Sequence, residues 1–456
     1  MDQTIRPASA DRVASAPGSD RLVVLDALRG FAALGILWRN IFVFGLPTVA
    51  FSLPEEWGEN VVSNVATWLY VVIFVDGTMR GMFSLIFGAT ALLLLDRYAR
   101  RPGGLLAADL YFRRLMWLVV FGLVHGYVLL WPHDVLYVYG ILGMFLFAFR
   151  NMSGRRLLLI GLAIFAVSSL KDGTGWSLDQ ISNDAFDASQ TESLEGSGGA
   201  QPGGDALPAD PAPIAAGPAE VETSETEDEV AMFEELERLA LAEMDERLAG
   251  YTDLVRTLAL ETFQEQTTLF FTDHVLDVGA MMFFGMALFR LGAFSGRWTS
   301  GQYAVMAVIG LAGGLVLGFL IHGATAVPGY SEWSIGSADA YLYNLRRLLL
   351  CLGLIGLANL LARGRVSRTL LMPFTAVGRI PLTTYVGQTV ICVALFYGVG
   401  LGLFGTLEHH QLLGIAFAIN LAQVVFAFIW LKLVGQGPLE ALLRRLVGIG
   451  IETGRH

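Results

Sequence analysis

The sequence predicts an all-α fold, a polytopic membrane helix bundle with about 10 transmembrane helices and one short re-entrant or interfacial helix. The chain of 456 residues is 54% hydrophobic and only 16% charged, whereas an average soluble domain is about 25% charged. Its mean hydropathy is +0.57. Apolar runs of roughly 17–25 residues, the length of a membrane-spanning helix, recur from one end of the chain to the other.

Each predicted span is an apolar run that ends at polar or charged residues. The run at 61–76 is short for a full span. We interpret it as a re-entrant or interfacial helix, because a further span here would move the arginines that follow to the opposite side of the membrane. The predicted spans are 22–46, 79–97, 113–131, 134–150, 154–171, 275–292, 302–322, 340–361, 371–398 and 410–434.

The arginines between these spans indicate which side each loop occupies. The short loops at 47–60, 132–133, 323–339 and 399–409 contain neither Lys nor Arg, whereas every short loop on the other side contains Arg. This is the positive-inside pattern of a multi-pass protein whose termini are both cytoplasmic. The first 20 residues are polar and lack the apolar region of a signal peptide, in agreement with a cytoplasmic N-terminus.

An acidic insert separates two membrane halves. Residues 172–265 carry 23 acidic and 3 basic side chains, whereas the rest of the chain has 27 basic and 18 acidic ones. The predicted regions are a cytoplasmic tail (1–21), an N-terminal transmembrane half (22–171), an external insert (172–274), a C-terminal transmembrane half (275–434) and a cytoplasmic tail (435–456).

Within the insert, about 186–218 is rich in Ser, Gly, Pro and Ala, which is typical of disorder. From about 226 to 266, apolar residues recur at helical spacing beside an acidic face. This pattern predicts an amphipathic helix that lies against the external surface, as a lid or a packing element. The two cysteines, Cys351 and Cys392, both lie in apolar runs and are expected to be buried thiols.

The first span begins "LDALRGFAALGILWRN" and carries charged groups that lipid would not accept. Arg29 and Asn40 are 11 residues apart, so they differ by ~20° around the helix and are separated by ~16 Å along it. Asp26 lies one turn from Arg29 and is its natural partner. The pair could serve helix packing alone, but Asn40 extends the line, and we therefore interpret it as a polar track across half the membrane.

A second polar site is predicted where the third and fourth spans meet, in "GLVHGYVLLWPHDVLYVYG". Intramembrane histidines usually face the protein interior, and a neutral imidazole can act as a general base near pH 7. His125 is therefore a catalytic candidate, although a hydrogen bond to a backbone carbonyl would also explain it. Asp134 is either a partner for such a base or the N-cap of the next helix.

Further intramembrane cations are Arg80 and the pair Arg346–Arg347. Arginine binds phosphate and carboxylate in a bidentate manner, so at least one of them is expected to serve an anionic ligand. Six of the seven histidines fall on the external half, but apart from His409–His410 they lack ligand spacing. We therefore expect no metal. The stripe of Gly310, Gly314 and Gly318 indicates close helix packing.

Three stretches together carry a family resemblance. "LDALRGFAALGILWRN", "GTMRGMFSLIFGA" and "GLVHGYVLLWPHDVLYVYGILG" resemble the N-terminal half of the bacterial YeiB-like family of inner-membrane proteins. "VGRIPLTTYVGQTVICVALFYGVGLGLFG", followed by "GPLEALLRR", resembles its second half. The resemblance implies a multi-pass protein of the bacterial inner membrane.

That family is similar in its first half to transmembrane acyltransferases such as heparan-alpha-glucosaminide N-acetyltransferase. The resemblance implies transfer of an acyl group from cytoplasmic acyl-CoA, as donor substrate, to a hydroxyl or amine on the external face, for example of a glycan or another small acceptor. Arg29 resembles the arginine of the shared first-helix motif, and Asn40 the asparagine that precedes a catalytic histidine in the heparan enzyme. In the type-3 enzymes the position of Asn40 is itself histidine.

This sequence departs from both patterns, because neither position 40 nor 41–57 holds a histidine. Thr78 and His133 also stand where the family usually has Lys and Gly. If acyl transfer occurs, His125 supplies the base, and Asp134 or Asn40 orients it. Asn40 could also donate a hydrogen bond to the oxyanion.

Arg29, Arg80 and Arg346 would then hold the anionic donor. The alternatives are a membrane transporter, or a structural membrane protein with a polar intramembrane cavity. Besides the lipid bilayer, the sequence leaves a homodimer open and predicts no nucleic-acid partner.

Overall fold

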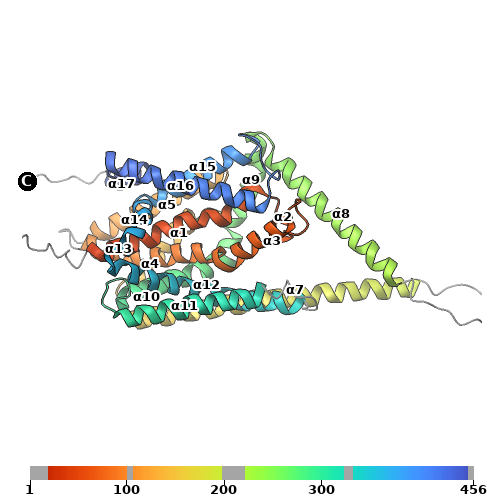
Figure 1. The fold of residues 1–456 in the computed structure, drawn as a ribbon, viewed down its shortest axis with the longest axis horizontal. Coiled ribbons are helices and arrows are strands. Elements are labelled where there is room, and N and C mark those ends of the chain that lie inside the picture. Colours follow the sequence, from red (N-terminus) through yellow and green to blue (C-terminus); the bar gives the residue numbers. More distant parts are fainter. Residues whose placement is uncertain (1–18, 100–105, 198–220, 323–331, 450–456) are drawn as a thin grey trace, which may run out of the picture.

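The computed structural model describes residues 19–99, 106–197, 221–322 and 332–449, and within these ranges it contains helices and no strand (Figure 1). The all-α prediction is therefore confirmed. The helices are α1 (Ser19–Gly45), α2 (Thr48–Ser52), α3 (Val61–Tyr70), η1 (Val71–Val75), α4 (Thr78–Ala99), α5 (Leu106–Tyr127), α6 (Val135–Leu146), η2 (Phe147–Phe149), α7 (Gly154–Ser197), α8 (Val221–Arg247), α9 (Tyr251–Gln266), η3 (Phe270–His274), α10 (Val275–Leu291), α11 (Ser300–His322), α12 (Glu332–Arg363), α13 (Arg365–Leu370), α14 (Met372–Gly378), α15 (Pro381–Phe396), α16 (His409–Leu433) and α17 (Pro438–Gly448).

Seven helical stretches in the described ranges are long and apolar enough to cross a membrane, and an eighth is added if one bent pair is counted as a span. This confirms a membrane protein with several spans. Each of the ten predicted spans is helical over most of its length, but the number ten stays a prediction. Helix α5 carries two arginines and a histidine among its apolar residues, and Val135–Phe149 is short. The seven stretches are Val23–Gly45, Val61–Tyr98, Gly154–Gly175, Tyr251–Leu291, Ser300–His322, Asp339–Arg363 and His409–Leu433.

The segment that we expected to form one span over 371–398 is broken. Helices α14 and α15 meet at an angle of 87°. The break lies at Arg379–Ile380, directly before Pro381, which stands in the first turn of α15. Proline has no backbone N–H to continue a helix and restricts the residue before it. The bend places the seven residues of α14 beside α1 and directs α15 through the bundle.

Helices α1 and α14 touch through glycines. A Cβ atom on Gly30 would lie 1.9 Å from the carbonyl oxygen of Phe374, and one on Gly378 would lie 1.8 Å from that of Asp26. Since no side chain fits at such distances, both positions require glycine. The same contact brings the C-terminal half of the chain against the first turns of α1, next to Arg29.

The bundle has two distinct ends. Helix α1 begins and α17 ends at the same end, where α13 also lies (Figure 1). Contacts between segments also show which loops share an end. Arg363, at the end of α12, donates to the carbonyl oxygens of Gly296 and Trp298, which lie in the connection between α10 and α11. The described parts of the loops with arginine lie together at this end, which we call the arginine end, and the described parts of the loops without Lys or Arg lie at the opposite end. The arrangement agrees with the predicted sidedness, and the assignment of the arginine end to the cytoplasm stays a prediction.

The acidic insert leaves the bundle at the end opposite the arginine end. Helix α7 continues past its apolar part and projects from the bundle, and α8 returns diagonally toward it (Figure 1). Residues 186–197, where we expected disorder, are helical as the end of α7. Residues 198–218 of the same prediction lie outside the described residues.

The predicted amphipathic helix over 226–266 is two helices, α8 and α9. Its chain turns at Gly250, an extended residue before α9, where the Leu248 carbonyl packs against Gly398. Leu254 and Leu258 of α9 are buried, so this helix belongs to the bundle rather than to its surface.

Candidate active site

Arg29 lies in the first turns of α1 and is closely held. One of its terminal nitrogens donates to Asp26 at 2.7 Å and to the Gly378 carbonyl at 3.1 Å, and the other donates to the Thr90 hydroxyl at 3.0 Å. The predicted pairing with Asp26 is therefore present. Because these contacts join α1 to α4 and α14, Arg29 stabilises the packing of three helices, and few of its donors remain for a ligand.

Asn40 lies on the same side of α1 as Arg29, as the helical period requires, and is partly exposed. It makes no side-chain hydrogen bond to another described residue. One turn further, Phe44 stacks on Trp131 with ring centroids 4.1 Å apart. Asn40 thus lies near the connection between α5 and α6 but does not contact His125 or Asp134. Between Arg29 and Asn40 the helix carries buried apolar residues, so α1 alone does not supply a continuous polar track.

The strongest chemical arrangement is a buried row of three side chains from different parts of the chain. His125 Nδ1 lies 2.7 Å from Asp134 Oδ1, and its Nε2 lies 2.8 Å from the Thr389 hydroxyl. His125 is 1% exposed and Thr389 is 2% exposed. An ionised Asp134 can only accept, so it fixes the proton on Nδ1 and leaves Nε2 to accept the proton of Thr389.

Local structure explains how these groups meet. Asp134 is the N-cap of α6 and accepts from the Tyr137 backbone N–H at 2.8 Å, as one reading of the sequence predicted. His125 lies in the last turn of α5, and the connection between α5 and α6 contains Leu130 with φ +62°, a left-handed conformation that is uncommon for leucine. Leu130 is buried, so surrounding packing holds this strained turn in place.

Thr389 of helix α15 completes the row, and it was not identified as a site residue from the sequence. Thr389 and Tyr385 lie one turn apart on it, and the Tyr385 hydroxyl accepts from the Trp131 indole N–H at 3.1 Å. Gln388 donates to the Ala33 carbonyl of α1 and to Gln423 of α16, at 3.0 and 3.1 Å. The available signal was the polar sequence TTYVGQT within an apolar run, because buried polar groups need partners.

Helix α9 covers the row at the end opposite the arginine end. A Cβ atom on Gly126, next to His125, would lie 2.6 Å from the Thr262 methyl group. His133, next to Asp134, contacts Glu265 at 2.7 Å and Glu261 at 3.2 Å. Desolvation of the His133 ring lowers its pKa, but hydrogen bonds to the two carboxylates outweigh this and raise the pKa to about 9. His133 therefore fixes α9 as a protonated imidazole at neutral pH.

Arg80 lies far from Arg29. Along α4, Thr90, which contacts Arg29, is ten residues beyond Arg80, or ~15 Å. Arg80 pairs with Asp277 at 2.8 Å, and Arg347 pairs with the other oxygen of the same carboxylate. The two arginines thus share one carboxylate, which balances only one of their two positive charges.

A cavity of about 140 Å³ lies beside this ion cluster. It is lined by Arg80, Ser168, Asp172, Asp273, His274, Asp277, Tyr343 and Asn344.

Arg346 is almost completely buried, and it donates to the carbonyl oxygens of Val72 and Ile73 in the π-helical turn η1. Its role is to satisfy irregular backbone, which lipid cannot do. Arg29, Arg80 and Arg346 were predicted together as donor-binding residues, but Arg29 lies apart from the other two. The sequence predicted the helix on which each arginine lies, but it did not show which parts of these helices lie next to one another in the bundle.

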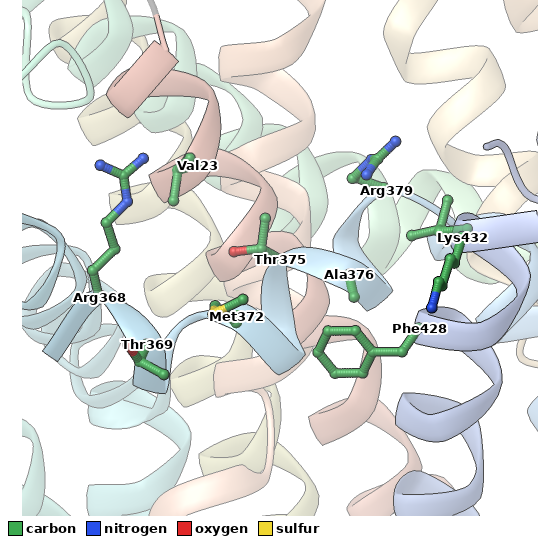
Figure 2. A pocket seen from close by; sticks show the side chains of 10 residues that line it. Val23, Arg368, Thr369, Met372, Thr375, Ala376, Arg379, Phe428 and Lys432 are labelled. Carbon is green, nitrogen blue, oxygen red and sulfur yellow. The ribbon is translucent and has the colours of Figure 1, made fainter. Parts of the chain in front are cut away.

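A second cavity, of about 550 Å³, lies at the arginine end between α1, α13, α14 and α16 (Figure 2). His125, Asp134 and Thr389 line neither of these two cavities, and all three residues are buried. No group of three or more potential ligands is placed to hold a metal ion in the described part of the chain.

Comparison with known proteins supports a resemblance to one family. Residues 288–449 match a family model described as a protein of unknown function (DUF418). The chain is 27% identical over 445 residues to the uncharacterized protein YeiB of Escherichia coli strain K12, an alignment that covers 94% of this chain and 96% of that protein. It is 25% identical over 442 residues to the uncharacterized protein YxaH of Bacillus subtilis strain 168, covering 93% and 94%.

No solved structure matches the chain with statistical significance. Both relatives are bacterial, and both align along nearly their whole length. The resemblance to the YeiB-like family is therefore confirmed, and it extends over almost the entire chain.

Proposed function

We propose that the protein is a membrane acyltransferase that moves an acyl group from cytoplasmic acyl-CoA to a hydroxyl or amine on the external side, with Thr389 carrying the group in between. The observation that supports this proposal is the row of Asp134, His125 and Thr389. An acid, an imidazole and a hydroxyl in this order form the arrangement that activates a hydroxyl as a nucleophile on unrelated folds.

In the first step, His125 Nε2 takes the proton of the Thr389 hydroxyl while its oxygen bonds to the thioester carbonyl carbon. The carbon–sulfur bond breaks, and the CoA sulfur takes the proton from His125. Asp134 holds the imidazole in the required tautomer and stabilises its transient positive charge. In the second step, the acceptor gives its proton to His125 and attacks the threonine ester, and the Thr389 oxygen leaves and regains that proton.

The position of the row suits transfer between two sides. Thr389 lies at the middle of the 16-residue helix α15, about 12 Å from either end of that helix. Donor and acceptor could therefore reach the same hydroxyl from opposite ends. The row is enclosed, so each substrate requires a movement of the surrounding helices. Helix α9, which covers the row, is the element we propose to move on the acceptor side.

Detection of the acyl-enzyme tests this proposal. Purified protein is incubated with a short-chain acyl-CoA carrying an isotopic label, and peptide mass spectrometry locates the label. We expect an acyl group on Thr389, none in Thr389→Val, and strongly reduced labelling in His125→Gln. Thr384→Val is the matched control, because Thr384 is equally buried on the same helix but its hydroxyl donates only to the backbone of Ile380. Labelling elsewhere, or none with a folded protein, would contradict the proposal.

One observation favours a transporter instead. The 140 Å³ cavity beside the Arg80–Asp277–Arg347 cluster is polar and lies away from the His125 row. Intramembrane charges around a cavity are typical of a solute pathway. Uptake by proteoliposomes that depends on Asp277 but not on Thr389 would support this alternative against acyl transfer.

A further inference from the structure

The 550 Å³ cavity at the arginine end has an unusual lining for its position. Three of its ten lining residues are cations: Arg368 from α13, Arg379 directly after α14, and Lys432 from α16. None of the ten is acidic. Arg368 lies on one side of the cavity, and Arg379 and Lys432 lie on the other (Figure 2). The cations therefore surround the space rather than gather at one point, which suits an extended anionic group.

Five of the other seven lining residues are apolar, and this apolar part of the lining continues onto the outer surface. Met372 and Phe428 both line the cavity, although 53% and 42% of their surface is exposed. On α16, Phe428 continues a stripe of exposed apolar side chains with Val425 and Leu421, one and two turns earlier. This stripe belongs to a candidate membrane span, so the cavity opens where lipid acyl chains would lie.

Lys432 lies in the last turn of the same helix, at the level where a span ends. Long basic side chains at this level extend toward the headgroup layer. A cavity with cations at the headgroup level and apolar side chains toward the bilayer centre has the polarity of a phospholipid. The nucleotide part of acyl-CoA would instead need hydrogen-bond partners for its base and ribose. Among the lining side chains only Thr369 and Thr375 are uncharged polar groups, so the cavity suits a phospholipid better than CoA.

We propose that this cavity binds the headgroup of an anionic phospholipid, with Arg368, Arg379 and Lys432 around its phosphate and one acyl chain along Met372 and Phe428. This site is separate from the proposed acyl transfer and does not depend on it. Bound lipid would bridge α13, α14 and α16 at the point where α14 packs on α1. Anionic lipid should therefore stabilise the bent segment as well as occupy the cavity.

The test compares lipids on delipidated protein in a neutral detergent. Phosphatidylglycerol or cardiolipin should raise the thermal midpoint by several degrees, and phosphatidylcholine of the same chain length should not. The combined variant Arg368→Gln, Arg379→Gln, Lys432→Gln should bind phosphatidylglycerol about 100-fold more weakly by native mass spectrometry, because each cation near the headgroup contributes about fivefold.

A matched control separates the cavity from general charge. The control is a combined variant with Arg155→Gln, Arg156→Gln and Arg445→Gln. It removes the same charge from exposed positions at the arginine end that do not line the cavity. Its lipid binding should stay near that of the parent protein. Thr369→Trp fills the exposed rim without changing charge and should also weaken binding, which guards against a folding defect in the charge variant. Equal loss in the two triple variants would overturn the site, as would displacement of the lipid by CoA at lower concentration.

Discussion

The two ends of the bundle both use charged side chains to close helix termini, but arginines are concentrated at one of them. At the arginine end, guanidinium groups donate to carbonyl oxygens at helix ends, such as Arg379 to Gly435 at 3.3 Å and Arg113 to Ile449 at 2.6 Å. At the other end, carboxylates accept backbone N–H groups at helix starts: Glu243 accepts from Thr48 at 2.8 Å.

Helix termini leave such groups without partners in their own helix, and an apolar bundle offers few alternatives. The comparison teaches that the arginine pattern is not only a sidedness signal, because the same residues close the helix ends. Charge removed from either end should therefore change the fold as well as the topology. Four predictions test this comparison of the two ends, in order from the largest expected effect to the smallest.

The comparison fails completely if the ends do not lie on opposite sides of the membrane. Arg155→Cys at the arginine end and Glu246→Cys in α8 both introduce an exposed thiol. The native Cys351 and Cys392 are buried and should not react. In intact cells an impermeant maleimide should label position 246 and leave position 155 unlabelled until the membrane is opened. Labelling of both positions, or the reverse pattern, would refute the assignment of the arginine end to the cytoplasm.

The largest effect on stability is expected from Asp277, which forms ion pairs with two arginines. Asp277→Asn leaves Arg347, which is 1% exposed, without its charged partner. Loss of one member of a buried ion pair costs about 3–5 kcal/mol, so the thermal midpoint in detergent should fall steeply.

Glu440→Gln at the arginine end is the control for this prediction. Glu440 accepts from the Leu382 and Thr383 backbone and from the Thr383 hydroxyl, with no arginine involved. Glutamine keeps an acceptor oxygen, so we expect a cost of at most about 1.5 kcal/mol. Equal destabilisation by the two substitutions would show that the shared carboxylate is not the main support of its end.

Asp134 separates stability from chemistry at the same end. Asparagine can still cap α6, so Asp134→Asn should change the free energy of unfolding by about 1 kcal/mol or less. Asp134→Ala removes the cap and should cost about 0.5–2 kcal/mol more than Asp134→Asn. The amide introduced by Asp134→Asn would donate to Nδ1 and reverse the tautomer of His125. Acyl-enzyme formation should then fall by about 10⁴-fold, as in a hydrolase whose histidine is held in the wrong tautomer. Full labelling of the Asp134→Asn variant would exclude a role for Asp134 in activating Thr389.

The smallest effect is a pH dependence at His133. Its pKa is raised from 6.5 to about 9 in the folded protein, so its contribution to stability is complete below about pH 6.5 and is lost as the pH rises through about 9. Hydrogen exchange of α9 should accelerate between about pH 7 and pH 10 by more than the intrinsic rate. In His133→Gln this additional acceleration should be absent. An identical pH response in both proteins would show that His133 does not hold α9.

The sequence predicted the features that depend on one helix or one turn. The Asp26–Arg29 pair is set by helical spacing, and Asp134 caps α6 because a short acceptor before an apolar run suits a helix start. Features that depend on how distant helices pack were not predictable. Thr389 meets His125 only because α15 crosses the bundle beside α5, and nothing in either segment specifies that neighbour.

The same limit explains the corrections. Arg29, Arg80 and Arg346 looked equivalent as buried cations, but helix directions place the last two near the opposite end. The turn at Gly250 was missed because apolar spacing continues through it, while the packing of Leu248 against Gly398 decides where the helix stops. For the arginines, as for this turn, the deciding contact comes from a distant segment of the chain.

The bend between α14 and α15 has a consequence for biosynthesis. Seven residues of helix reach about 10 Å and sixteen reach about 24 Å, whereas the hydrocarbon core is about 30 Å thick. Neither piece is a complete signal for the insertion machinery. The segment gains its place from Gly30 of α1, a helix that the ribosome finishes long before it reaches α14. We therefore expect the first helix to act as a template on which the late, incomplete span of α14 and α15 is assembled, so that the insertion of this segment depends on α1 already being in place.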